Sequence, residues 1–278
     1  MNLVTHMTMD TTIINSSIFI FFMKFKTTKY HLDLLNDKNR LSCFFEAINE
    51  YDGNTTLAYD LGCGSGILSY FLSSYFDDVI SIEIDNSAYN CAKENLVNFD
   101  NIEVINSDVL EYNFTKKADL IVCEMMDTAL IDEEQVPVLS HAKQFLKEDG
   151  LIIPKGIINS CELVNMEREY IHWDENVNYE VFSDSVIYSQ FDFLDEIDSE
   201  FEATISIKAK RDGIINGLKI TTFTKLNDNI ICGPTPMLNP PLLIPLPEQI
   251  VKSNDFINVK LKYIMGNGIE SIEANIVR

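Results

Sequence analysis

The chain has 278 residues, of which 46% are hydrophobic, so it is long and apolar enough for a folded core and is not mainly disordered. Its 21 Lys and Arg residues stand against 43 Asp and Glu residues, which gives a net charge of -22. This charge disfavours a broad electrostatic grip on nucleic acid, because phosphates would be repelled, and instead fits a cationic partner, such as a protein with basic side chains, or simple solubility.

The first 25 residues are expected to be an apolar, disordered or loosely docked leader. The run from Ile13 to Phe25 is too short to cross a bilayer, and no Lys or Arg precedes it as a signal peptide requires. The six cysteines show no C-x-x-C spacing, and the four histidines form no H-x-x-x-H pair. We therefore expect no metal site, no membrane anchor and a cytoplasmic location.

Residues 26–154 alternate between helical and strand patterns. Helical spacing of apolar residues predicts helices over 31–51, 67–76, 87–98 and 134–146, the last with Gly150 as its C-cap. Short apolar runs predict strands over 57–61, 79–84, 102–105, 118–123 and 151–153. This alternation predicts an α/β, Rossmann-like domain with a doubly wound parallel sheet.

After Pro154 the pattern changes to short runs of β-branched and aromatic residues between turns. This change predicts a C-terminal antiparallel β domain, barrel-like in form, over residues 155–278. The insert between Asp174 and Glu202 is acidic, and its stretch 192–202 is expected to be a solvated face, with attraction of a basic substrate as the alternative. The segment from Pro234 to Pro247 is expected to be a rigid surface loop.

The sharpest motif is Asp60-Leu61-Gly62-Cys63-Gly64-Ser65-Gly66, between a predicted strand and a predicted helix. Glycines there let a ligand approach the backbone, and the start of a helix offers free N–H groups. The third glycine of a nicotinamide-cofactor fingerprint would fall at Ile67, so the motif departs from that pattern.

Two acidic residues follow neighbouring strands. Glu83 ends the second strand, where a carboxylate can bind both hydroxyls of a ribose, and Asp108 follows the third strand, placed for an adenine amino group. Together with the glycine motif these acids suit S-adenosylmethionine. The expected cofactor-binding residues of this loop and these strands are Asp60, Gly62, Gly64, Gly66, Glu83 and Asp108.

The motifs over roughly residues 30–154 resemble class I S-adenosylmethionine-dependent methyltransferases. A narrower resemblance lies in Glu124, which ends the fourth strand, and Glu133, nine residues later, which are similar to the double-glutamate loop of the protein arginine methyltransferase family. The resemblance implies that both glutamates clamp a substrate guanidinium and that Arg40 binds the cofactor carboxylate. Counting back from Gly150 places the second acid at Asp132 instead, so both positions stay open.

The chain departs from the family pattern in three places. The Thr-His-Trp loop would fall near Met237–Pro241, which lacks both His and Trp, and Phe21–Phe25 has phenylalanine where tyrosines are usual. The dimerisation arm is shortened, so the oligomeric state, a dimer in the first instance, is left open. His31 is expected to orient the loop or to lie at the surface, and His172 to pack beside Trp173.

The expected function is therefore methyl transfer from S-adenosylmethionine to a nitrogen, most simply on a protein arginine side chain, with Glu124 touching the substrate nitrogen and not the cofactor. An RNA or small-molecule acceptor is an alternative, although the fourth strand ends in Glu124-Met125-Met126-Asp127 and not in the Asn-Pro-Pro-aromatic motif of base-amine enzymes. A catalytically silent binding module is a further alternative, opposed by the intact glycine loop and Glu83.

Overall fold

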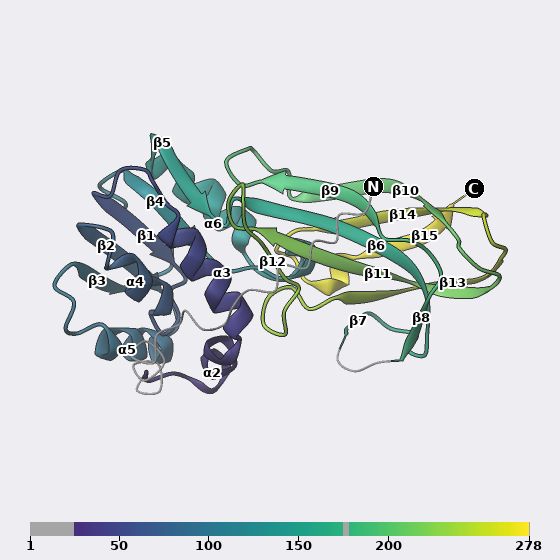
Figure 1. Cartoon of the computed structure of the whole chain (residues 1–278), viewed down its shortest axis with the longest axis horizontal. Coiled ribbons are helices and arrows are strands. Elements are labelled where there is room, and N and C mark those ends of the chain that lie inside the picture. Colours follow the sequence, from purple (N-terminus) through teal and green to yellow (C-terminus); the bar gives the residue numbers. More distant parts are fainter. Residues whose placement is uncertain (1–24, 175–177, 278) are drawn as a thin grey trace.

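The computed structural model describes residues 25–174 and 178–277, which form two lobes side by side along the long axis of the molecule (Figure 1). Helices and parallel strands make up the first lobe, and antiparallel strands make up the second. The expected leader and most of the Phe21–Phe25 motif lie outside the described residues. Phe25 itself packs edge-on against Tyr70, with ring centroids 6.4 Å apart.

The first lobe is built on a five-stranded sheet of order β3-β2-β1-β4-β5, with every pair parallel. Its elements are α2 (Lys29–Asn36), α3 (Lys38–Asn49), β1 (Leu57–Leu61), α4 (Ile67–Leu72), β2 (Asp78–Glu83), α5 (Asn86–Asn95), β3 (Ile102–Asn106), β4 (Ala118–Cys123), the 3-10 turn η1 (Thr128–Leu130), α6 (Gln135–Ala142), the 3-10 turn η2 (Lys143–Phe145) and β5 (Leu146–Ile153). The predicted Rossmann-like sheet is thereby confirmed. The strand order reverses between β1 and β4, and this reversal opens a crevice at their carboxyl ends.

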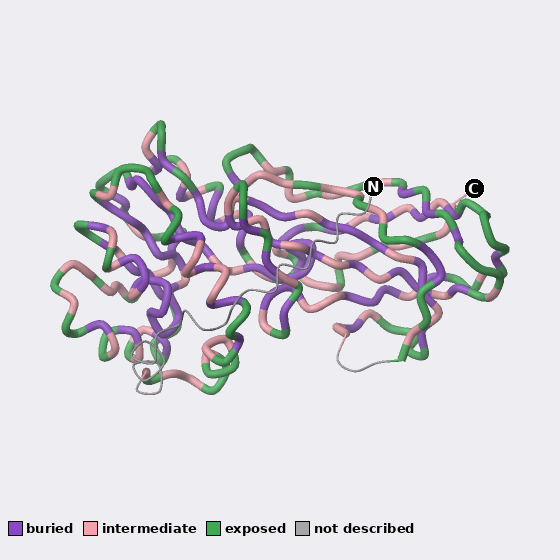
Figure 2. The backbone as a smooth tube through the Cα atoms, viewed as in Figure 1, coloured by how far each residue is buried: buried purple, intermediate pink, exposed green. Residues whose placement is uncertain are grey.

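The two central strands are apolar because both of their faces are covered. Every residue of β1 and β4 is buried, as Figure 2 shows for the interior of this lobe. Strands of a parallel sheet that are buried on both faces have continuous hydrophobic sequences. The bounds that the sequence predicted for these two strands therefore agree with those in the structure.

The second lobe holds two antiparallel sheets, which confirms the predicted β domain. Its elements are β6 (Gly156–Met166), β7 (His172–Trp173), β8 (Tyr179–Val181), β9 (Val186–Asp192), β10 (Glu200–Lys208), β11 (Gly213–Lys225), β12 (Ile231–Cys232), β13 (Leu242–Val251), β14 (Phe256–Ile264), the 3-10 turn η3 (Ile269–Ser271) and β15 (Glu273–Val277). One sheet has the order β7-β13-β11-β6-β8, with β12 beside β11 and β9 beside β6, and the other has the order β10-β14-β15. One continuous cluster of buried apolar side chains runs through both lobes.

The predicted helix over 31–51 is two helices, α2 and α3, because the chain breaks at Asp37. Asp37 has ψ 85°, outside the helical range, and its Oδ1 accepts a hydrogen bond of 3.1 Å from the backbone N–H of Arg40. This is an N-cap, in which a side-chain oxygen satisfies a free N–H at the start of a helix.

The predicted helix over 134–146 is also shorter than expected. Helix α6 ends at Ala142, and β5 begins at Leu146, so that Gly150 lies inside a strand and the prediction of a C-cap is wrong. The strand forms because Leu146 pairs with Ala118 of β4, and Lys147 donates a hydrogen bond of 2.6 Å to the buried carboxylate of Asp119. A long-range pairing therefore overrides the local helical pattern.

The prediction of a rigid loop over Pro234–Pro247 is wrong for its second half, which belongs to strand β13. Proline lacks the N–H that a strand needs, so it is confined to edges and bulges. Pro245 of β13 lies opposite Gly217 of β11, next to an irregularity in the pairing between Ile215 and Gly217. The extra residues at this irregularity lie in β13 itself, between Pro245 and Gln249, so the bulge that accommodates the proline is in its own strand.

All six cysteines are free. Within residues 25–174 and 178–277, no helix is long and apolar enough to cross a membrane. In the same part of the chain, no group of three or more His, Cys, Asp and Glu side chains is arranged to hold a metal ion.

Asp37 joins the two lobes next to the crevice. While its Oδ1 caps α3, its Oδ2 accepts hydrogen bonds from the Thr235 hydroxyl and, at 3.1 Å, from the backbone N–H of Met237 in the second lobe. One buried carboxylate thus fixes the start of α3 against the loop that precedes β13.

We expect Asp37→Ala to lower the free energy of unfolding by about 2–4 kcal/mol, because it removes an N-cap and two hydrogen bonds to a carboxylate. Asp37→Asn keeps only one of the two acceptor oxygens and should lose less than Asp37→Ala but more than nothing. Urea unfolding followed by circular dichroism checks this, with Asp33→Ala on the exposed side of α2 as the control. Equal stabilities for Asp37→Ala and Asp33→Ala would contradict the role of Asp37.

Candidate functional site

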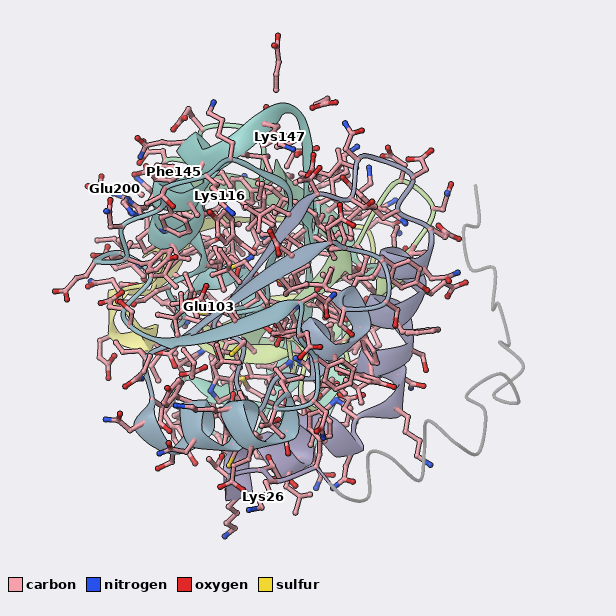
Figure 3. The ribbon with its side chains drawn as sticks, turned by 90° about the vertical axis from the view of Figure 1, so that its left-hand side faces the viewer. Lys26, Glu103, Lys116, Phe145, Lys147 and Glu200 are labelled. Atoms are coloured by element: carbon pink, nitrogen blue, oxygen red, sulfur yellow. The ribbon has the colours of Figure 1, made fainter. Side chains whose placement is uncertain are left out.

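A cavity of about 210 Å³ lies at the carboxyl ends of β1 and β4, at the point where the strand order reverses. Figure 3 views this lobe end-on, with Lys116 and Lys147, which lie at the start of β4 and β5, in the upper half and Lys26 at the bottom. The chain after Lys26 enters α2, which covers the cavity. The cavity wall includes the sequence-predicted residues Arg40, Gly62, Gly64, Glu83, Asp108, Glu124 and Glu133.

Two glycines of the loop after β1 are required by the close approach of neighbouring side chains. Gly62 and Gly64 have φ of +71° and +55°, which disfavours any residue with a Cβ. A Cβ on Gly62 would lie 2.7 Å from the Met125 sulfur, and one on Gly64 would lie 2.7 Å from the His31 ring. The glycine motif therefore packs against Met125, which follows β4, and against His31 of α2.

Two predicted cofactor-binding residues, Asp60 and Gly66, are not part of the cavity wall. Asp60 is buried within β1 and accepts a hydrogen bond from the Ser69 hydroxyl, and burial raises its pKa to about 7. Gly66 starts α4 with φ +89°, where a Cβ would lie 2.7 Å from the Leu96 side chain. Both residues therefore support the glycine loop through contacts with the neighbouring helices and do not form the cavity wall.

Glu83 presents a fixed carboxylate to the cavity. It is 7% exposed, its Oε2 accepts from the Gly64 N–H at 2.8 Å, and its Oε1 accepts from the Asp85 N–H at 2.8 Å. Because each carboxylate oxygen can accept a second hydrogen bond, both oxygens remain available to hydroxyl groups in the cavity. Asp108, in the wall beside Ser107, uses Oδ1 to accept from the Leu110 N–H at 2.8 Å.

Arg40 and Glu124 form a buried ion pair in the cavity wall. Arg40 Nη2 donates to Glu124 Oε2, and the side chains of the two residues are 4% and 10% exposed. Burial opposes the charge on Arg40, but Glu124 and Asp37 outweigh it, so the pKa of Arg40 is raised. Burial raises the pKa of Glu124, and Arg40 opposes that rise.

The same guanidinium has unused hydrogen-bonding capacity. Arg40 Nε and Nη1 are buried and have no hydrogen-bond partner among the described residues. Buried donors of a cation are costly unless they are paired, so this geometry fits an anionic group of a bound ligand. Glu124 therefore contacts Arg40, the residue that the sequence assigned to the cofactor. The expectation gave these two residues separate roles and did not include this contact.

Glu133 lines the cavity, whereas its neighbour Asp132 is exposed and is not part of the wall. The structure thus favours Glu133 as the second acid that the sequence left open. Burial raises the pKa of Glu133 to about 8, and the nearby carboxylates of Glu124, Asp127 and Asp132 add to the rise. In the free protein this carboxyl group is mainly protonated at neutral pH.

Two residues of the site were not assigned to it from the sequence. His31 lies in the wall with Nδ1 at 2.7 Å from the Thr28 hydroxyl, and burial lowers its pKa. Gln135 is fully buried; its Oε1 accepts from the Met125 N–H at 3.0 Å, and its Nε2 donates to the Cys123 carbonyl at 2.8 Å. Gln135 thereby closes the loop that carries Glu124, a role that no local pattern signals.

His172 does not line the cavity. It is 7% exposed, and its Nδ1 lies 2.7 Å from the Tyr170 carbonyl, as the predicted packing role requires.

Part of the chain matches a known family model, and most of it is similar to two uncharacterized proteins. Residues 58–150 match the family model of a methyltransferase domain. The chain is 46% identical over 255 residues to an uncharacterized protein of Methanothermobacter thermautotrophicus, covering 92% of this chain and 100% of that protein. It is 38% identical over 258 residues to an uncharacterized protein of Methanocaldococcus jannaschii, covering 91% and 99%.

The chain is similar in sequence to proteins of named activity over only part of its length. Protein arginine N-methyltransferase 2 of Homo sapiens is 31% identical over 165 residues, which is 55% of this chain and 38% of that protein. Ribosomal protein L11 methyltransferase of Thermoanaerobacter sp. is 35% identical over 116 residues, which is 41% and 36%. The Trypanosoma brucei PRMT1 enzyme–prozyme heterotetrameric complex with AdoHcy shares the fold, with a TM-score of 0.75 over 90% of this chain and 98% of that chain, at 16% identity.

The raised pKa of Glu133 predicts a pH-dependent stability. The folded protein holds a proton that the unfolded chain releases near pH 4.5, so the contribution of Glu133 is full below pH 4.5 and is lost as pH rises toward 8. We expect Glu133→Gln to be more stable than the parent by at least about 1 kcal/mol at pH 8, with a smaller difference at pH 5.

Thermal and urea unfolding across this pH range measures the difference. Glu134→Gln, at the exposed neighbouring carboxylate, is the control. Parallel stability curves for Glu133→Gln and the parent would contradict the assignment.

Proposed function

Since the chain belongs to the class I S-adenosylmethionine-dependent methyltransferases, and to one family with the two proteins of Methanothermobacter thermautotrophicus and Methanocaldococcus jannaschii, we propose that it methylates a nitrogen of protein arginine side chains. The observation that carries the proposal is that Glu124 and Glu133 line the same cavity as the glycine loop and Glu83.

The polar groups of the cavity wall match the groups that S-adenosylmethionine would present to them. Glu83 offers two acceptor oxygens for ribose hydroxyls, Asp108 offers a carboxylate for the adenine amino group, and Arg40 offers buried Nε and Nη1 donors for a carboxylate. When bound, S-adenosylmethionine supplies a methyl group activated by its positively charged sulfur. The protein has to hold the acceptor nitrogen in line with that group and to exclude water.

The two glutamates suit a guanidinium acceptor. A guanidinium is protonated at neutral pH and presents planar donors, which two carboxylates can hold by charge-assisted hydrogen bonds. Arg40 keeps Glu124 charged and oriented for this contact. The apolar side chains of Met125, Met126 and Val138 line the same cavity and limit the access of water.

Glu133 is suited to handle the proton. Its pKa of about 8 means that the arrival of a cation favours its ionised form and releases a proton from it. As the new N–CH₃ bond forms, the nitrogen must lose a proton. A carboxylate of raised pKa accepts a proton more readily than an ordinary carboxylate does.

Three further proposals concern partners, domains and compartment. The net charge of -22 favours a basic protein substrate over RNA.

For the oligomeric state we propose a dimer, because the solved neighbour is a heterotetrameric complex. Light scattering of the purified chain tests this proposal. We also propose domains over 26–154 and 155–278, and the cytoplasm as the compartment, because all six cysteines are free thiols.

A second acceptor class is supported by one observation. The chain resembles ribosomal protein L11 methyltransferase over 41% of its length, and Met237 lines the cavity near the place where the Thr-His-Trp loop of arginine methyltransferases would lie. Another protein nitrogen, such as a lysine or N-terminal amine, is therefore the alternative product.

The acceptor is identified by transfer of tritiated methyl groups to a cell lysate, with separate samples treated with protease and with RNase. Acid hydrolysis of the labelled protein should yield methylarginines. Label in methyllysine alone supports the second acceptor class, and label that survives protease but not RNase contradicts both protein readings.

We expect Glu124→Gln and Glu133→Gln each to lower single-turnover methyl transfer at least about tenfold, because each removes a charge-assisted contact to the acceptor and 1.36 kcal/mol is one decade in rate. Asp132→Asn, at the exposed neighbouring acid, is the matched control and should keep most of the rate. Full activity of both Gln variants would rule out the guanidinium clamp. Cofactor titration of Glu124→Gln is needed beside the rate, because Glu124 also holds Arg40.

We expect Glu83→Ala to weaken S-adenosylmethionine binding at least about tenfold, since hydrogen bonds to a charged group contribute about 1.5–3 kcal/mol each. Isothermal titration calorimetry measures the affinity. Glu103→Ala, on the exposed face of the neighbouring strand β3, is the control (Figure 3). Unchanged affinity in a folded Glu83→Ala protein would remove Glu83 from the cofactor site.

A further inference from the structure

A third carboxylate lies behind the two glutamates of the cavity. Asp127 is in the loop between β4 and α6, is 8% exposed and is not part of the cavity wall. Its Oδ1 accepts hydrogen bonds from the backbone N–H groups of Asp132, at 3.0 Å, and Glu133, at 3.2 Å. Its Oδ2 is buried and has no hydrogen-bond partner in the part of the chain that the structure describes.

The loop between Asp127 and Glu133 has a conformation that it does not favour by itself. Ala129 and Leu130 have φ of +60° and +61°, in the left-handed region that is unfavourable for residues with a Cβ. The second lobe holds the middle of this loop, where Ala129 N–H donates to the Thr222 hydroxyl at 2.8 Å. Its far end, at Asp132 and Glu133, is held by the Asp127 carboxylate.

The turn after β14 braces the same loop from outside. Gly266 N–H donates to the Leu130 carbonyl at 3.0 Å, and Gly268 N–H donates to the Ile131 carbonyl at 2.9 Å. These contacts fix the carbonyl groups of the loop, whereas Asp127 fixes the two N–H groups that precede the Glu133 side chain. The bonds to Asp127 are therefore the direct constraint on where Glu133 points.

We propose that Asp127 is a positioning residue for Glu133, which holds the backbone so that Glu133 faces the cavity and whose charge helps Glu133 to keep its proton until a cationic substrate binds. The role assigned to Glu133 in catalysis rests on the proposed function. The positioning of Glu133 by Asp127 rests on hydrogen bonds to the backbone and does not depend on which acceptor is methylated.

The charged surroundings support this coupling. The titratable groups that act on Glu133 are Glu124, Asp127, Asp132 and Arg40, with Tyr30 also within its field. Those that act on Asp127 are Asp132 and, from β14, Tyr263. Burial raises the pKa of Asp127 to about 7, so both carboxyl groups titrate near neutral pH, and ionisation of one disfavours ionisation of the other.

The first test needs no substrate. In Asp127→Asn the amide oxygen keeps the position of Oδ1 while the charge is removed, so we expect the titration midpoint of Glu133 to fall by about half a pH unit or more. Carbon-13 NMR of the carboxyl groups of the whole chain measures it, and the Glu133 signal is the one absent from Glu133→Gln. Glu134→Gln is the control and should leave the midpoint in place. An unchanged midpoint in Asp127→Asn would overturn the coupling.

The second test uses methyl transfer to whichever acceptor the lysate experiment identifies. We expect Asp127→Ala to lower turnover by about tenfold or more, because a displacement of about 1 Å in a reacting group is enough for such a loss. Asp127→Asn should restore most of the rate and move the acid limb of the pH profile to lower pH, because Glu133 acts in its ionised form. In the Glu133→Gln background both substitutions should have little further effect.

Losses at Asp127 that add in full to that of Glu133→Gln would show a role unrelated to Glu133. If Asp127→Ala does not fold, Asp127→Asn still decides through its titration and its pH profile. If the acceptor is not arginine, the lysate experiment yields no methylarginine while the titration of Glu133 still responds to Asp127, so the two failures are distinguishable.

Discussion

The buried ion pair between Arg40 and Glu124 is the interaction on which the site depends. Removing one partner of such a pair leaves an uncompensated buried charge, at a cost of about 3–5 kcal/mol. The pair forms only because α3 starts at Asp37 and the loop after β4 is closed by Gln135. Asp37 in turn binds the second lobe through Thr235, so the geometry of the ion pair is tied to the contact between the lobes.

The buried cation of Arg40 is surrounded by an excess of acids. Asp60, Glu83, Glu124 and Glu133 lie in or behind the cavity wall around Arg40, and burial raises the pKa of Asp60 and of Glu133. Asp60 and Glu133 are held partly protonated in this way, because burial and neighbouring negative charges both disfavour ionisation. A cationic acceptor and the positively charged sulfur of the cofactor would each relieve this repulsion, which explains why a strongly acidic chain suits this chemistry.

Tertiary contacts decided several features that local patterns misjudged. The strand β5 begins at Leu146, where a helix was predicted to end, because Leu146 pairs with Ala118. Strand β13 includes Pro245 because β13 bulges between Pro245 and Gln249. Asp60 and Gly66 belong to a motif that indicates ligand binding, yet neither of them lines the cavity. Asp127 and Gln135 carry no recognisable pattern, since their roles come from hydrogen bonds to backbone groups five to twelve residues away.

The sequence by itself determined the parallel sheet, the glycine loop and the acids at the strand ends, because buried strands need apolar runs and the positive φ of Gly62 and Gly64 needs glycine. It also marked Arg40, Glu124 and Glu133, through the resemblance of their motifs to those of the protein arginine methyltransferase family. Only the tertiary structure decided that Arg40 bonds to Glu124, that Glu133 and not Asp132 lines the cavity, and that Asp127 lies behind them. These outcomes depend on how two lobes enclose one loop, and such long-range packing leaves no local signal in the order of residues.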